Sequence, residues 1–170
     1  MVEIRIREAI EQDVRYLAEL VSEFRNEHSR MIGGQGNVFV RDGLKEVERY
    51  RRREDTGYFV AVDARSRIVG FRRWEQRDGF HFTRELYVTP AMRRKGVAKE
   101  LIRHFEQWVL EKGQQIACIS CTPHNAAMIA LARSEGYTTL NTIELRKNLD
   151  GSTERPRGET HALGLVWELL

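Results

Sequence analysis

The sequence predicts an α/β domain in which an antiparallel meander is followed by a β-α-β unit. Segments with period-two alternation and segments with helical spacing of apolar residues follow one another in the order β-α-α-β-β-β-α-β-α-β-β. The 170 residues contain no internal repeat, low-complexity stretch or linker. We therefore expect residues 1–170 to form a single domain.

The first elements are a strand and two helices. VEIRIR (2–7) alternates with period two and predicts a strand, and residues 11–28 have the apolar spacing of an amphipathic helix. MIGGQGNVFV (31–40) is rich in glycine and predicts a loop. Asp42 is placed to cap a second helix that runs to about Glu54.

Three segments predict a meander of antiparallel strands. YFVAVD (58–63) and IVGFRRW (68–74), joined by the short polar segment ARSR, predict a hairpin. The pair Asp78-Gly79 favours a tight turn into a third strand over about 80–89.

A helix and a buried strand follow. Residues 96–112 carry apolar side chains at helical spacing, and Gly113 is placed to end that helix. QIACISC (115–121) predicts a buried strand that Pro123 stops.

The last elements are a short helix and a strand pair. Asn125 is placed to open the helix and Gly136 to end it. TIELRKNL (142–149) and HALGLVWEL (161–169) predict two strands around a polar loop.

Composition fits a globular protein that lies outside membranes. Apolar residues make up 41% of the chain and charged residues 31%. There is no run of about 18 apolar residues, and the N-terminus lacks the apolar region of a signal peptide. We therefore expect a cytoplasmic protein with no membrane partner.

The net charge of +3 permits anionic ligands without requiring nucleic acid. The basic runs are 49–53 and 93–95, and aromatic residues do not interleave them as a base-stacking surface requires. A nucleic-acid partner is therefore not expected. Cys118 and Cys121 form a lone C-x-x-C, which we interpret as two reduced, mostly buried thiols rather than a metal site.

Three cations stand at the predicted start of a helix, in the stretch LYVTPAMRRKGVAKELI (86–102). A helix N-terminus already carries partial positive charge, so adding cations there is unfavourable unless an anion binds. Free amides at the start of the helix, together with Gly96, suit phosphate oxygens. The spacing matches neither a P-loop nor a dinucleotide fingerprint. The plainer alternative is a solvated basic loop.

The context of this loop carries a resemblance to a known family. The run V-T-P-A-M-R-R-K-G-V-A, after a strand and before a helix, resembles motif A of the GNAT acetyltransferase superfamily. The family pattern Q/R-x-x-G-x-G/A is filled here by Arg93, Gly96 and Ala98. Downstream, HNAAMIALARSEGY (124–137) resembles the family's N-x-x-A-x-x-x-Y-x-x-x-G-F segment.

The resemblance implies one GNAT-like α/β domain. Its mixed, mostly antiparallel central sheet would have about seven strands, with strands four and five splayed apart, and about four flanking helices. It also implies an N-acetyltransferase that moves acetyl from acetyl-CoA to a primary amine by direct attack in a ternary complex. The acceptor is a small molecule or a protein amine, no metal is implied, and a homodimer is left open.

The resemblance also implies cofactor-binding residues. Backbone amides over 93–98 would hold the CoA pyrophosphate, the three cations would screen its charge, and the Val88 amide would polarise the thioester oxygen. Asn125 would contact the pantetheine arm. The expected cofactor-binding residues are Val88, Arg93, Arg94, Lys95, Gly96, Val97, Ala98 and Asn125.

Proton transfer is where the match fails. The family's usual general acid, a tyrosine, falls on Ala132. Glu85, on the strand that leads to the acetyl site, is the first candidate for the catalytic base, and an ion pair with a nearby arginine is its structural alternative. Weaker candidates for an acid or a base are His81, Tyr87, Cys121 and His124.

The acceptor side is expected over about 24–42, where the sequence shows no evident acidic cluster. The loss of the tyrosine keeps a second function open. In that alternative the chain is a catalytically impaired, regulatory domain that binds acyl-CoA.

Overall fold

The computed structural model describes residues 3–150, 158–162 and 164–169. The chain divides into two compact units, Met1–Cys121 and Thr122–Leu170. That residues 1–170 form one domain stays a prediction.

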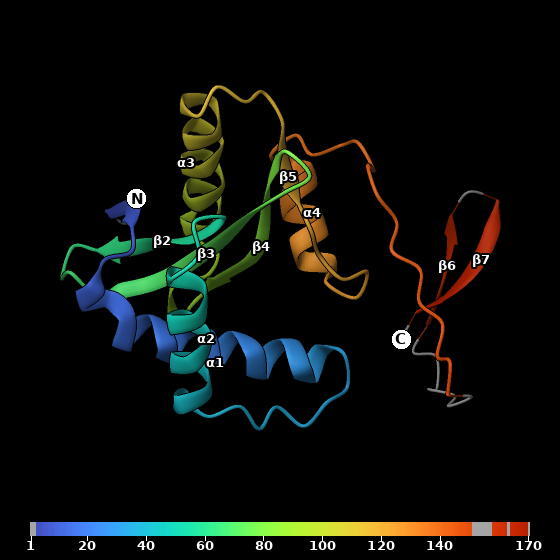
Figure 1. The fold of residues 1–170 in the computed structure, drawn as a ribbon, viewed down its shortest axis with the longest axis horizontal. Coiled ribbons are helices and arrows are strands. Elements are labelled where there is room, and N and C mark those ends of the chain that lie inside the picture. The colour runs from blue at the N-terminus through green and yellow to red at the C-terminus, as the bar shows by residue number, and fades with distance from the viewer. Residues whose placement is uncertain (1–2, 151–157, 163, 170) are drawn as a thin grey trace. The chain divides into compact units, whose positions relative to one another are not determined.

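The first unit is built on a mixed five-stranded sheet with the strand order β1-β2-β3-β4-β5 (Figure 1). The first three pairings are antiparallel, and β4 pairs with β5 in parallel. The strands are β1 Ile4–Glu8, β2 Thr56–Asp63, β3 Ile68–Arg77, β4 Phe80–Val88 and β5 Ala117–Ile119.

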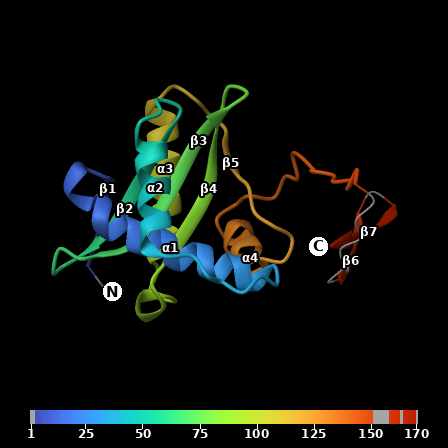
Figure 2. The ribbon, with the colours of Figure 1, turned by 60° about the horizontal axis from the view of Figure 1, so that its bottom comes forward.

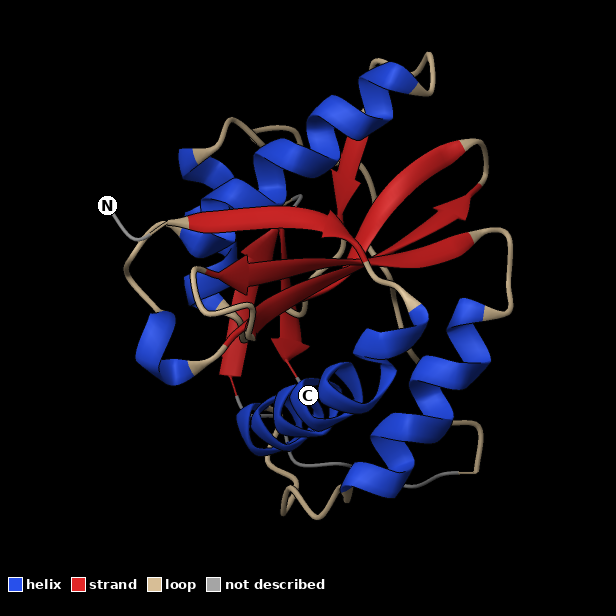
Figure 3. Ribbon diagram, turned by 90° about the vertical axis from the view of Figure 1, so that its left-hand side faces the viewer, coloured by secondary structure: helices blue, strands red, loops and turns tan. Residues whose placement is uncertain are grey.

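Helices cover both faces of this sheet. The helices α1 and α2 cross each other on one face, and α3 packs on the other (Figures 1 and 2). Figure 3 distinguishes the helices, in blue, from the strands, in red. The helices are α1 Val14–Met31, α2 Val40–Arg51 and α3 Val97–Glu111, with short 3-10 turns at Glu11–Asp13 and Pro90–Met92.

The core forms as two apolar layers, one on each side of the sheet. On β2, Tyr58 and Val60 pack toward α1 and α2, whereas Phe59 and Ala61 pack toward α3. Alternation places successive side chains on opposite faces, so a strand covered on both sides is apolar throughout. Full burial of each large side chain contributes about 1.5–3 kcal/mol.

The predicted meander is confirmed, including its turn. Asp78 and Gly79 have φ angles of 53° and 81°, the left-handed values that a tight two-residue hairpin turn requires. Between β3 and β4 the register shifts, because Trp74 faces Thr83 whereas Arg73 faces Glu85. The extra residue, Arg84, is a β-bulge.

The bulge changes which face of the sheet the side chains of β4 occupy. His81 packs against Trp108 of α3, with ring centroids 4.8 Å apart, whereas Glu85 binds Arg25 of α1. In a regular strand two residues four apart would share a face. The bulge therefore brings the second half of β4, from Glu85 onward, into a new register toward α1.

Strands β4 and β5 separate, as the family resemblance implied. They pair only from His81 with Ala117 to Thr83 with Ile119. Beyond Thr83, β4 continues to Val88 paired with β3 but no longer with β5. The last part of β4 therefore has one open edge within this unit.

The second unit holds α4 (Ala126–Ser134) and a separate two-stranded sheet of β6 (Gly158–Ala162) and β7 (Leu165–Leu169). The expected helix between Asn125 and Gly136 is confirmed. The central sheet has five strands rather than about seven, because the last pair forms this sheet of its own.

The prediction of a strand over 142–149 is wrong, and β6 pairs with β7 instead. Alternation made residues 142–149 look like a strand, but alternation cannot show whether a partner strand is available. Among the described residues, no helix is long and apolar enough to cross a bilayer.

Candidate functional site

The connection from β4 to α3 forms a turn lined with backbone amides. After the 3-10 turn at Pro90–Met92, Arg94 and Gly96 both adopt left-handed conformations, with φ angles of 62° and 87°. Gly96 is the N-cap of α3, and no side chain caps the helix there. The first amides of α3 therefore have no partner within the helix, which is the arrangement that binds anions at helix N-termini in other proteins.

Gly96 serves this turn through its conformation. A Cβ built on it would meet nothing within 4 Å, so the free protein has room for a side chain at this position. The left-handed φ is the feature that favours glycine. A larger residue would be strained here and would also project from the turn where an anion would bind.

The three cations of the turn point in different directions. Arg93 folds back toward the sheet, where its Nε donates to the Val88 carbonyl at 2.9 Å and its Nη2 donates to Glu27. The Lys95 ammonium donates to the Ala91 carbonyl at 2.8 Å, which closes the turn on itself. Arg94 is exposed.

Val88 presents its backbone to the open edge of β4. The Thr89 amide donates to the Val69 carbonyl on β3 at 2.9 Å. Because successive residues of an antiparallel strand direct their polar groups to alternate edges, the amide and carbonyl of Val88 face away from β3. They face the side on which β5 has already separated.

Glu85 lies on β4 as expected, and its carboxylate is buried among arginines. Its side chain is 3% exposed, and Oε1 accepts from Arg73 Nε at 2.9 Å and from Arg25 Nη2 at 2.7 Å. Oε2 is buried without a hydrogen-bond partner among the described residues. The ion pair that the sequence offered as the structural alternative is thus present.

This ion pair belongs to a network that joins four elements. Arg25 of α1 also binds Glu46 of α2, while Arg73 comes from β3 and Glu85 from β4. Burial works against the charge of Arg73, but the neighbouring Glu85 carboxylate raises the pKa of Arg73 overall. The network fixes α1 and α2 over the same end of β4 that leads to Val88.

Two glutamates that sequence reasoning missed converge on Tyr87. The Tyr87 hydroxyl lies 3.1 Å from Oε2 of Glu23 and 3.3 Å from Oε1 of Glu27. Burial, followed by the charges of Glu23 and Glu27, raises the pKa of Tyr87. The spacing of four residues on α1 is the only sequence signal for this pair, and it does not reveal which strand the helix covers.

The weaker sequence candidates occupy ordinary structural positions in the first unit. His81 Nδ1 lies 2.6 Å from Oε1 of Gln114, and the imidazole packs on Trp74 and Trp108. Both cysteines are free thiols, and partial burial raises the pKa of Cys118. Cys118 is half-buried and Cys121 is exposed, so the expectation that both are mostly buried is wrong.

In the second unit, Asn125 caps α4. Its side-chain oxygen accepts from the Met128 amide at 3.0 Å, which satisfies one of the free donors of the helix start. Ala132 is buried within the same helix, where it offers no proton. Asn125 as a pantetheine contact stays a prediction.

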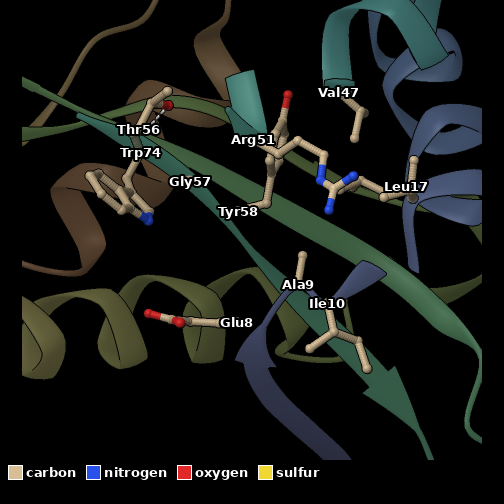
Figure 4. A pocket seen from close by; sticks show the side chains of 11 residues that line it. Glu8, Ala9, Ile10, Leu17, Val47, Arg51, Thr56, Gly57, Tyr58 and Trp74 are labelled. Carbon is tan, nitrogen blue, oxygen red and sulfur yellow. Dashed lines mark hydrogen bonds between the residues drawn. The ribbon is translucent and has the colours of Figure 1, made fainter. Parts of the chain in front are cut away.

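A pocket of about 200 Å³ lies at the other end of β3 (Figure 4). It is lined by Thr56, Tyr58 and Trp74 from the sheet, and by Leu17 and Val47 from the helices among others. Trp74 is four residues along β3 from Gly70, the partner of Val88, which is a distance of about 13 Å. The pocket is therefore separate from the turn at the start of α3.

Comparison with known proteins gives a family match over most of the chain. The sequence profile of the acetyltransferase (GNAT) family matches residues 17–137. The L-methionine sulfoximine/L-methionine sulfone acetyltransferase of Salmonella typhimurium is 32% identical in an alignment of 95 residues that covers 52% of this chain and 56% of that protein. The matched region therefore spans only about half the length of this curated relative.

Solved structures share the fold at low sequence identity. The aminoglycoside N-acetyltransferase AAC(6')-Iy, in complex with CoA, is 16% identical with a TM-score of 0.70, over 88% of this chain and 97% of that chain. AAC(6')-IG from Acinetobacter haemolyticus is 20% identical with a TM-score of 0.67, over 86% and 99%. The PaiA N-acetyltransferase from Thermoplasma acidophilum, in complex with coenzyme A, is 20% identical with a TM-score of 0.65, over 79% and 89%.

Proposed function

Because this chain belongs to the GNAT family of acetyltransferases, we propose that it transfers an acetyl group from acetyl-CoA to a primary amine by direct attack in a ternary complex. The single observation that carries the proposal is the join between β4 and α3. There the open edge at Val88 leads, within a few residues, to the start of α3, whose first amides no side chain caps. The thioester carbonyl and the pyrophosphate are the two groups of acetyl-CoA that such an edge and such a turn suit.

Each end of the site has a chemical task. Backbone amides over 93–98 bind the pyrophosphate oxygens, and the exposed Arg94 adds a positive charge beside them. Ala98 keeps the surface of the first helical turn small. The amide of Val88 donates to the thioester oxygen, whose negative charge grows during attack.

In the transfer, the amine nitrogen replaces the CoA sulfur on the acetyl carbonyl carbon. The nitrogen lone pair of the neutral amine forms the new C–N bond, and the C–S bond breaks with its electron pair leaving on sulfur. The amine loses one proton to a base, and the CoA thiolate takes one from solvent, because Ala132 supplies none. General acid assistance is typically worth about 10²–10⁴-fold, so its loss slows transfer without preventing it.

Glu85 stays the predicted base, and it is supported by the unpartnered Oε2 on the strand that carries Val88. A water molecule would have to relay the proton, since the side chain is only 3% exposed. Glu23 and Glu27 are the other carboxylates near the end of β4, through their contacts with Tyr87.

The acceptor is proposed to be a small-molecule amine. The curated relative is named for L-methionine sulfoximine and its sulfone, and two of the structural neighbours are aminoglycoside acetyltransferases. Helices α1 and α2, with the glycine-rich loop between them over 32–39, cover the face beside Tyr87 and would bound that amine.

Calorimetry with acetyl-CoA, followed by a thiol-release assay over an amine panel, tests the proposal. The panel contains kanamycin, L-methionine sulfoximine and a peptide with a free N-terminus. We expect acetyl-CoA to bind with a dissociation constant between about 1 μM and 1 mM, and one small amine to release CoA thiol.

Absence of binding at millimolar acetyl-CoA would overturn the proposal. Binding without thiol release from any amine would favour the regulatory, acyl-CoA-binding alternative. Release with the peptide alone would move the acceptor class to protein amines.

A further inference from the structure

We propose that the Arg93 side chain is a positioning residue, which holds the Val88 carbonyl beside the Val88 amide, and does not bind the phosphates of CoA. The inference rests on the proposed function, because it concerns how the site for acetyl-CoA is held in shape. It separates the role of the Arg93 side chain from that of the Arg93 backbone amide, which remains part of the turn.

Two of the three guanidinium nitrogens, Nε and Nη2, are engaged on the sheet side of the turn, although the side chain is 42% exposed. Nε donates to the Val88 carbonyl at 2.9 Å, and Nη2 donates to the two carboxylate oxygens of Glu27 at 2.8 and 2.7 Å. Its central carbon lies 5.4 Å from the centre of the Tyr87 ring. Turning Arg93 toward a phosphate would break a charge-assisted bidentate pair and leave the Val88 carbonyl without this donor.

The hydrogen bond from Arg93 to the Val88 carbonyl bears directly on the proposed reaction. The carbonyl and amide of Val88 face the same open edge of β4, so the donor for the thioester oxygen sits beside an acceptor that would repel that oxygen. Arg93 covers the acceptor with a hydrogen bond and places a positive charge beside it. That carbonyl belongs to the Val88–Thr89 peptide, whose amide donates to Val69 on β3, so Arg93 and β3 hold this peptide from opposite edges, next to the Val88 amide.

Glu27 anchors the other end of the guanidinium. Through Glu27, Arg93 is linked to α1 and to the Tyr87 hydroxyl, 3.3 Å from Oε1 of Glu27. The contact joins the turn that binds the cofactor to the helix that covers the acceptor side. Only a forked cation reaches both the carbonyl and the carboxylate at once, and lysine lacks this geometry.

Arg94 is the matched control. It has the same charge, is the next residue in the turn, and is exposed. If phosphate charge were the role of both arginines, substituting either would weaken CoA binding alike. If Arg93 positions Val88, the two substitutions have different effects.

The test compares Arg93→Met, Arg93→Lys, Arg94→Met and Glu27→Gln by calorimetry with CoA and by steady-state kinetics. We expect Arg94→Met to raise the dissociation constant of CoA about 3- to 10-fold with little change in kcat. We expect Arg93→Met and Arg93→Lys to lower kcat about 10- to 100-fold, as small misplacements of reacting groups do, while CoA affinity changes less than about 2-fold. Glu27→Gln should shift kcat in the same direction as Arg93→Lys.

A second readout needs no acceptor. The amide resonance of Val88 in the nitrogen–proton NMR spectrum of the CoA complex should shift in Arg93→Lys and stay in place in Arg94→Met. This measurement also serves if Arg93→Met fails to fold, since Arg93→Lys keeps the charge and most of the side-chain volume.

The proposal is overturned if Arg93→Met weakens CoA binding as much as Arg94→Met, or if Arg93→Lys restores the wild-type kcat and Val88 resonance. The failure of the proposed function looks different, because the wild-type chain would then bind no CoA. A wild type that binds CoA but acetylates nothing leaves the affinity comparison and the NMR readout to decide the role of Arg93.

Discussion

Gly96 determines, at the scale of a single residue, whether the turn can receive an anion. Its φ of 87° and the open space at its Cβ position leave the amides at the start of α3 uncovered. Gly79 in the β3–β4 turn has a φ of 81° and equally open surroundings. The two glycines therefore have the same backbone requirement, and only Gly96 belongs to the proposed site.

Gly96→Glu is expected to abolish CoA binding, because the carboxylate would place negative charge and volume where the pyrophosphate binds. Gly79→Glu carries a comparable strain in the left-handed region and should leave the dissociation constant of CoA unchanged. Calorimetry on both variants checks this. Retained affinity in Gly96→Glu would put the cofactor elsewhere on the protein.

Glu85 neutralises two arginines, so its substitution is expected to be costly. With its side chain 3% exposed and that of Arg73 5% exposed, Glu85→Gln removes a buried negative charge and leaves Arg73 with Glu75, and Arg25 with Glu46, as their remaining carboxylate partners. We expect the free energy of unfolding to fall by about 3–5 kcal/mol. Glu46→Gln, which removes a more exposed partner of Arg25, should cost about 1 kcal/mol or less.

Urea unfolding of both variants measures this difference. Equal falls in the free energy of unfolding would contradict the prediction that the buried ion pair of Glu85 contributes more than the more exposed one of Glu46. Kinetics on the folded Glu85→Gln protein address its second predicted role. A changed pH–rate profile would support Glu85 as the base, and a profile identical to that of the wild type would remove it from proton transfer.

At the scale of elements, the junction between β1 and α1 depends on one carboxylate. Asp13 accepts from Arg7 Nη1 at 2.5 Å and Nη2 at 2.9 Å, and from the Ile10 amide at 2.8 Å. The hydrogen bonds from Arg7, despite the opposing effect of burial, lower the pKa of Asp13 below its ordinary value. The contact stabilises the end of β1 against the start of α1.

Asp13→Asn is expected to lower the free energy of unfolding by about 1–3 kcal/mol at pH 7. Because the pKa of Asp13 is lower in the folded state, its contribution is fully present above about pH 4 and is lost as the pH falls through the folded value. The difference between variant and wild type should therefore shrink toward pH 3. Urea unfolding at pH 7 and pH 3 measures it, with Asp78→Asn in the exposed turn as the control. A difference that stays constant with pH would contradict the ionic account.

The bulge at Arg84 is the element-scale feature that shapes the site. It separates the face used by His81 from the face used by Glu85, and it follows the last residues that β4 shares with β5. Beyond it, β4 carries Glu85 and Tyr87 toward α1 and leaves the polar groups of Val88 at the open edge.

At the scale of the whole molecule, the chain forms two units that differ in how much of their backbone lies in helices and strands. Residues 3–121 combine the five-stranded sheet with three helices, whereas residues 138–148 form no helix or strand and are almost entirely exposed. Backbone without ladder or helical hydrogen bonds is readily drawn into a protease active site.

Brief trypsin digestion is therefore expected to cut first after Arg146 or Lys147 and to leave the sheet unit intact. Mass spectrometry of the early fragments checks this. A first cut within residues 3–121 would show that the sheet unit opens more readily than residues 138–148 and would contradict the prediction.

The sequence predicted helices and turns well, and it predicted less well which strands pair with each other. The hairpin at Asp78 and Gly79, the helix that starts at Gly96 and the helix after Asn125 depend on neighbouring residues, and all three are confirmed. Residues 142–149 alternate like a strand but lie in none, because a strand also needs a partner, which alternation does not reveal.

The sequence by itself determined the turn at the start of α3, since Gly96 and the first residues of that helix are set by a few adjacent residues. Only the tertiary structure decided where the side chains around that turn go. Arg93 meets Glu27 and Glu85 meets Arg25 because the bulged end of β4 packs under α1, which lies some sixty residues earlier in the chain. Contacts at that separation depend on strand register and helix packing, and neither follows from the local pattern of residues.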